Sequence, residues 1–170
     1  NPVADTSFDH GAKIRLLEFL IHVNGIYFVP DGTRAKVYRK LANDLHEAKN
    51  TSYGWGRETT VAKTIKQFGP FVPNIAFEEF YQEILAVCLG NYWGRSSAHQ
   101  YLEEFILTLN TERLREILKL FHINDRVREE LYFRKPKAHA TSLLNKIKEK
   151  FTIEAYKSEV DDCIRMIEEL

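Results

Sequence analysis

The chain has 170 residues, of which 44% are hydrophobic and 28% are charged, and its 24 Lys and Arg balance its 24 Asp and Glu. This composition excludes a disordered chain, and the length suffices for one domain whose core needs no disulfide or metal. No apolar run approaches the roughly 20 residues of a membrane-spanning helix. We therefore expect residues 1–170 to form a single soluble domain with no membrane contact and no cofactor.

Two further features bear on where the domain acts. The chain starts at Asn1 without a Met and ends at Leu170 while a helical pattern is still running, so we expect a module excised from a larger protein. Cys88 and Cys163 both lie in apolar helical patterns, and no Cys/His zinc spacing occurs. We expect two buried free thiols and an intracellular, reducing compartment.

Apolar residues recur at helical spacing along almost the whole chain, which predicts an all-α fold, a compact array of about eight or nine helices. The one apolar stretch that could be a short strand is 26–29. Gly, Pro and capping residues mark the helix boundaries. The predicted helices cover residues 12–23, 33–49, 58–68, 75–89, 97–109, 111–121, 125–133, 138–150 and 152–170.

Both tryptophans of the chain begin the same tripeptide, Trp55-Gly56-Arg57 and Trp93-Gly94-Arg95, each followed by a hydroxyl residue and a helical pattern. The repetition predicts a duplicated helix entrance, with the two helices pointing in a common direction. Aromatic turns near residues 55, 92 and 132 are spaced as in helix-pair repeats. An array of irregular repeats is one interpretation, and an irregular bundle is the other.

The same tripeptide indicates an anion site. A helix amino terminus offers unpaired N–H groups and a partial positive charge, and Arg57 or Arg95 beside it would suit a phosphate or a carboxylate. The simpler interpretation is structural: Trp packs in the core, Gly permits a turn and Arg pairs locally.

A basic segment follows the aromatic pair Tyr132-Phe133. It contains Arg134, Lys135 and Lys137, and residues 113–150 hold eleven Lys and Arg against five Asp and Glu. Aromatic residues beside clustered cations are typical of nucleic-acid contacts. We expect this segment to be an extended, exposed loop around Pro136, and an ordinary charged surface is the alternative to nucleic-acid binding.

Arg and His recur at a third kind of spacing, which resembles that of helical RNases. Those enzymes place an Arg and a His on one helix with four to six residues between them, so that Arg stabilises phosphate charge and His assists proton transfer. Arg39/His46 is the best candidate because polar residues accompany it. The others are Arg15/His22, Arg115/His122 and Arg134/His139.

We therefore predict a protein-interaction or adaptor-type helical module rather than an enzyme, whose partner is another protein or a neighbouring domain of the parent chain. Several Tyr are expected to reach the surface, where Tyr favours interfaces. The alternative function is nucleic-acid or phosphate binding, and a helical RNase is the third. No metal site is predicted, because adjacent carboxylates on a helix diverge. The surface tyrosines are expected among Tyr38, Tyr53, Tyr81, Tyr101 and Tyr156.

Overall fold

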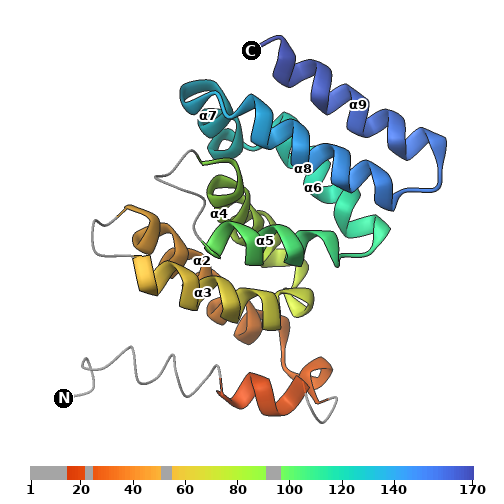
Figure 1. Ribbon diagram of the computed structural model, residues 1–170. Helices are drawn as coiled ribbons and strands as arrows, with labels where there is room; N and C mark the ends of the chain where they lie inside the picture. Colours follow the sequence, from red (N-terminus) through yellow and green to blue (C-terminus); the bar gives the residue numbers. More distant parts are fainter. Residues whose placement is uncertain (1–14, 22–24, 51–54, 91–96) are drawn as a thin grey trace.

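The computed structural model describes residues 15–21, 25–50, 55–90 and 97–170, and these residues contain helices and no strand. The all-α array predicted from periodicity is thus confirmed (Figure 1). A helix at 15–21 is followed by the short 3-10 helix η1 (Ile26–Phe28) and by eight α-helices, with η2 (Gly69–Phe71) and η3 (Asn74–Ala76) lying between the second and the third of them. The α-helices are α2 (Asp31–Asn50), α3 (Trp55–Phe68), α4 (Phe77–Leu89), α5 (Ser97–Leu107), α6 (Thr111–Ile123), α7 (Asp125–Arg134), α8 (Lys137–Lys150) and α9 (Glu154–Glu168).

Three local predictions need correction. Residues 26–28 form η1, closed by the N–H groups of Phe28 and Val29 on the carbonyls of Gly25 and Ile26, so the apolar stretch is no strand. Helix α3 begins at Trp55, so that the first Trp-Gly-Arg forms the first helical turn instead of preceding it. Helix α9 begins at Glu154 and not at residue 152, and Ile153 takes its N-cap position without a side-chain hydrogen bond.

Helix α4 lies at the centre of the fold (Figure 1). It packs against α2, α5, α6, α7 and α8. Ten of its 13 residues are buried, from Phe77 to Leu89. A helix that is apolar on nearly every side must be surrounded by other helices, and this one joins the α2–α5 half of the molecule to the α6–α9 half.

The first two helix pairs stack in a regular way, because α2 contacts α4 and α3 contacts α5. Contacts between α3 and α5 advance together along both helices, from Lys63 beside Tyr101 to Lys66 beside Glu104. The two helices are therefore parallel, and their amino ends point the same way, as the duplicated tripeptide predicts. The later helices depart from this stacking: α6 packs on α9, and α7 packs on α4.

Asparagine caps fix where α6 and α7 begin. The Asn110 side chain accepts a hydrogen bond from the Arg113 N–H, and Asn124 accepts one from the Val127 N–H. Buried Asn124 also donates to Glu78 and, at 3.1 Å, to Gln82 of α4. A side chain that satisfies an orphan N–H of the first turn starts a helix, and here it also anchors α7 to the central helix.

A tight corner connects α7 to α8. Lys135 adopts a left-handed conformation with φ 49°, the sole positive-φ residue other than Gly among those described. Its N–H bonds to the Leu131 carbonyl, and Pro136 is buried. The extended, exposed loop expected around Pro136 is therefore wrong. Two residues suffice because the left-handed residue ends α7 and Pro136 precedes the first residue of α8.

Over the described part of the chain, no helix combines the length and the apolar character needed to cross a bilayer.

Candidate interaction surface

Two consecutive aromatic side chains project from α7. Tyr132 is 59% exposed and Phe133 is 73% exposed, and their rings meet edge to face with centroids 5.2 Å apart. Because the buried residues of α7 include Val127 and Leu131, the helix turns its opposite side outward. We call the outward residues, together with the adjoining end of α9, the aromatic surface; it comprises Asp125, Arg128, Glu129, Tyr132, Phe133 and Leu170.

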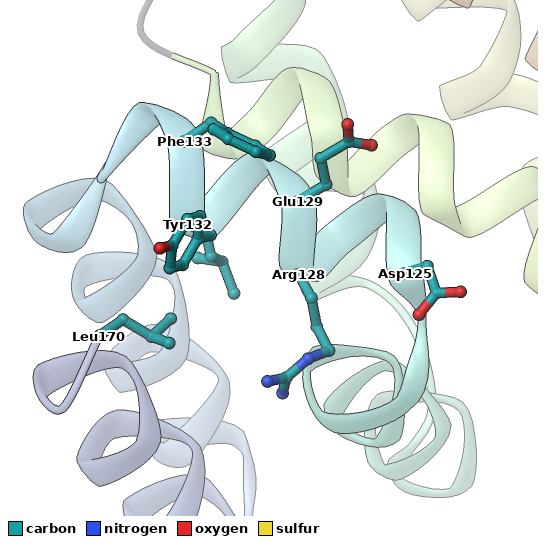
Figure 2. A pocket seen from close by; sticks show the side chains of 7 residues that line it. Asp125, Arg128, Glu129, Tyr132, Phe133 and Leu170 are labelled. Atoms are coloured by element: carbon teal, nitrogen blue, oxygen red, sulfur yellow. The ribbon is translucent and has the colours of Figure 1, made fainter.

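A shallow groove of about 260 Å³ runs across the aromatic surface, between α7 and the end of α9. In Figure 2 the Tyr132 ring faces Leu170, and Arg128 extends between this pair and Asp125. Arg128 is positioned by contacts of its Nη1 with the His122 carbonyl and the Met166 sulfur. The groove therefore combines an apolar wall with charges of both signs along its edge.

The predicted cations of the basic segment separate into two groups. The Arg134 Nε atom lies 2.9 Å from a carboxylate oxygen of Glu130, which is 5% exposed, so this charge is already matched. Lys135 and Lys137 are exposed at the corner beside the aromatic surface. Of the three predicted anion-binding residues in this segment, the two lysines are thus the ones left to meet a partner.

The structure describes little of the two Trp-Gly-Arg copies. The backbone of Trp55 to Arg57 belongs to α3, but the Arg57 side chain lies outside the described part of the structure. Arg95 lies outside the described residues altogether. Their predicted role in anion binding stays a prediction.

Most of the tyrosines expected at the surface are in the core or at its edge. Tyr38 and Tyr81 are fully buried, Tyr101 and Tyr156 are half-buried, and Tyr53 lies outside the described residues. Among the tyrosine side chains that the structure describes, the exposed one is instead Tyr132. Counting aromatic residues could not show this, because exposure depends on which helix face meets a neighbour.

The Arg39/His46 pair lies in a second depression, of about 280 Å³, between α2 and α4. We call it the polar groove; it is lined by Arg39, Ala42, Asn43, His46, Glu79, Gln82 and Glu83. The Arg39 Nε donates to Glu79 at 2.5 Å and its Nη2 donates to the Ile75 carbonyl at 3.1 Å. The His46 Nδ1 lies 3.0 Å from the carboxylate of Glu83.

Arg126 of α7 completes this cluster, and no pattern in the sequence indicated it. Its Nε donates to Glu83 at 3.1 Å and its Nη2 lies 3.2 Å from the His46 Nδ1. Burial lowers the pKa of Arg126, but the hydrogen bond and the charge of Glu83 outweigh it, and the pKa is raised overall. The nearly buried Glu83 carboxylate thus lies against the guanidinium of Arg126. The three residues come from three helices, so no local spacing relates them.

The polar groove has little to attract a phosphate. Each Arg is matched by a carboxylate, Arg39 by Glu79 and Arg126 by Glu83. A carboxylate against Nδ1 orients an imidazole as general bases are oriented, which is the one catalytic feature present. Sites that bind phosphates use an excess of positive charge, and this groove has none.

The Arg and the His of the Arg115/His122 pair contact different residues. Arg115 makes a bidentate pair with Glu159 and lies over the Tyr156 ring at 4.0 Å. The His122 side chain is exposed, and its Nε2 is 3.3 Å from the Cys163 sulfur.

Of the remaining two pairs, Arg134 and His139 lie on different helices. His22 lies outside the described residues. These contacts leave Arg39/His46 as the single Arg/His pair in which both partners line one groove of the described structure.

The cysteines behave as expected, since both are buried and free. Burial raises the pKa of the Cys163 thiol to about 12, with smaller contributions from Asp162 and Glu159. A thiol with such a pKa is almost entirely protonated near neutral pH and is a poor nucleophile. The contact with His122 therefore does not form a catalytic Cys-His pair. Among the described residues no group of His, Cys, Asp and Glu could hold a metal ion.

No family model, no curated protein and no solved structure matches this chain. The aromatic surface and the polar groove are therefore the features that bear on its function.

Proposed function

We propose that this chain is a protein-interaction domain and that its partner docks on the aromatic surface of α7 and α9. The observation that carries the proposal is the adjacent pair Tyr132 and Phe133, 59% and 73% exposed beside a groove. Tyr, Phe and Arg are enriched at protein interfaces, and a few such side chains supply most of the binding energy.

The position of the pair adds further support. The chain buries most of its described aromatic rings, including Tyr38, Phe80 and Tyr81. Two exposed rings in sequence, at the edge of a groove, contribute little to folding because they stay in water. Burial of their apolar area against a partner would contribute on the order of 25 cal/mol per Å². Arg128, held in place beside them, offers a charged hydrogen-bond donor to the same partner.

The test compares three forms of the 170-residue chain by chemical cross-linking in cell extract and mass spectrometry. They are the wild type, Tyr132→Ala/Phe133→Ala and Phe28→Ala. Phe28 is a matched control because it is 89% exposed and lies on η1, away from α7. We expect at least one protein to be cross-linked to the wild type and to the control but not to the double variant. Identical sets of cross-linked proteins for all three forms would contradict the proposal.

Nucleic-acid binding is the second candidate, and one observation favours it. Lys135 and Lys137 are exposed directly beside the exposed rings of Tyr132 and Phe133, and such an arrangement permits bases to stack while phosphates pair with cations. Fluorescence anisotropy with single-stranded RNA and DNA tests it. A phosphate-driven contact weakens steeply with salt, and Lys135→Ala/Lys137→Ala should reduce both the affinity and the salt dependence. The carboxylates on the same surface, such as Glu129, oppose this binding mode.

An RNase activity in the polar groove is the least supported candidate. It rests on Arg39 and His46 sharing one groove, with Glu83 against the imidazole. The proposal requires cleavage of RNA that His46→Ala abolishes while the circular dichroism spectrum is unchanged. Absence of cleavage by the wild type, or equal cleavage by the variant, removes this candidate.

A further inference from the structure

We infer that the partner on the aromatic surface is a second copy of this chain, docked so that the two α7 helices run antiparallel. This inference rests on the function proposed above and names the partner. Its basis is the order of charges along α7 and the corner that follows it.

Four exposed charges lie in two groups on either side of the aromatic pair. Asp125 and Glu129 are toward the amino end of α7, and Lys135 and Lys137 follow its carboxyl end. None of the four makes an ion pair within the described part of the chain, whereas neighbouring charges are paired, Arg134 with Glu130 and Arg126 with Glu83. Apart from Arg128, whose guanidinium contacts the His122 carbonyl and the Met166 sulfur, the surface thus presents an acidic end, an aromatic centre and a basic end.

A second copy reverses this order. Glu129 and Lys135 are each three residues from Tyr132, so a two-fold axis near Tyr132 brings the acidic end of each α7 opposite the basic end of the other. In an isologous interface every contact occurs twice. The attraction between the acidic end of one α7 and the basic end of the other therefore forms on both sides of the axis. The rings of Tyr132 and Phe133 lie near the axis, where the interface would exclude water most completely.

Other occupants fit this pattern less well. A nucleic acid, or a partner of one charge sign, would meet like charge at one end of the surface. The whole chain has a net charge of zero, so two copies do not repel each other at a distance. Some exposed charges on other helices pair within the molecule, as Lys66 does with Glu104 and Lys148 with Asp161.

The first measurement is sedimentation velocity of the 170-residue chain over a range of concentrations at low ionic strength, where surface charges are least screened. The wild type should show a dimer whose fraction rises with concentration. Tyr132→Ala/Phe133→Ala should weaken the dimer by roughly tenfold or more. Phe28→Ala should leave it unchanged. A circular dichroism spectrum of each variant verifies that the helices are intact.

The second measurement tests the antiparallel order. Glu129→Lys and Lys135→Glu should each weaken the dimer, because each places like charges opposite each other at both contacts. A mixture of the two variants should restore it, since every contact in the mixed dimer again joins opposite charges. Glu149→Lys, at an exposed position of α8, serves as the charge-matched control and should have no effect.

A chain that stays monomeric at every concentration overturns the inference, and so does a mixture that fails to restore the dimer. If the chain is monomeric and the aromatic double variant still loses a cross-linked cellular protein, the self-association is wrong and the proposed function stands. If the dimer forms and responds as described, and the one cross-linked protein that the double variant loses is the chain itself, the inference stands and identifies the partner.

Discussion

The α2–α5 half of the molecule and the α6–α9 half use their aromatic residues differently. In the first half, fully buried rings contact one another: Tyr38 meets Phe80 at 5.3 Å, and Tyr81 stacks on Phe105 at 5.9 Å. In the second half the core is mostly aliphatic, with buried Leu, Ile or Val from each of the four helices, and Tyr132 and Phe133 point outward. Aromatic residues therefore stabilise the first half, whereas in the second half two of them are exposed.

The largest expected effect is the loss of a ring from the aromatic core. Phe105→Ala removes a fully buried side chain that stacks on Tyr81, and the free energy of unfolding should fall by about 3–5 kcal/mol. Tyr132→Ala/Phe133→Ala removes two exposed rings and should change it by less than about 1 kcal/mol. Urea denaturation followed by circular dichroism measures both. An equal loss in the free energy of unfolding for the two variants would contradict the conclusion that the two halves use their aromatic residues differently.

The backbone of Gly69 packs closely against the aromatic core of the first half, so a substitution at this position tests that packing. A Cβ at this position would lie 2.1 Å from the Cζ of the Phe105 ring, and that ring is buried and cannot move away. Gly69→Ala should therefore destabilise the domain by about 1–3 kcal/mol. Gly32, in the first turn of α2, has open space beside it, since no heavy atom lies within 4 Å of where its Cβ would be. Gly32→Ala is thus the control and should be neutral or slightly stabilising, and the unfolding midpoints in urea compare the two.

Glu83 lies where the halves join, so its removal tests how they are held together. Glu83→Ala takes the carboxylate away from the half-buried Arg126 and from His46. The loss should be about 1–3 kcal/mol, because a half-buried cation is left without its partner. Glu79→Ala removes the more exposed partner of Arg39 and should cost less than about 1 kcal/mol. Thermal unfolding of both variants gives the ranking, and a larger loss for Glu79→Ala would contradict it.

The smallest effect is expected at the surface of the second half, from the pair of Arg115 and Glu159. The hydrogen bonds from Arg115 lower the pKa of Glu159 below its usual 4.5. Because the folded-state pKa is the lower one, the stabilisation is present above the usual value and is lost as the pH falls through the lowered one. The pair is partly exposed, so a double-mutant cycle with Arg115→Ala and Glu159→Ala should give only a small coupling energy near neutral pH. The coupling energy should vanish in acid, and a coupling independent of pH would contradict its origin in the Glu159 charge.

The helices of this protein were largely predictable from its sequence. Helical spacing of apolar residues and capping signals located all eight labelled α-helices, with Asp125–Arg134 and Ser97–Leu107 beginning at the residues predicted. These signals are local: a cap such as Asn110 bonds to an N–H three residues away. The three corrections, at 26–28, Trp55 and Ile153, are also local, since each concerns only a few neighbouring residues.

The candidate sites were predicted less well. The basic segment and the Arg39/His46 pair were recognised as patterns, but the sequence did not show that Arg134 is matched by Glu130 or that His46 meets Glu83 and Arg126. The sequence predicted that some of five tyrosines reach the surface, and two of those five, Tyr38 and Tyr81, are buried. Residues of α2, α4 and α7 come into contact only when the helices pack, and the spacing of residues along one helix cannot predict contacts between helices.

Local signals in the chain were enough to establish that it is helical, where most helices begin and end, and that its two cysteines are buried, because periodicity and capping act over a few residues. Packing of the helices on one another was needed to settle which aromatic rings are enclosed and which charges are matched. That choice depends on which face of each helix meets a neighbour, as when α7 packs against α4 and turns Tyr132 and Phe133 to the outside.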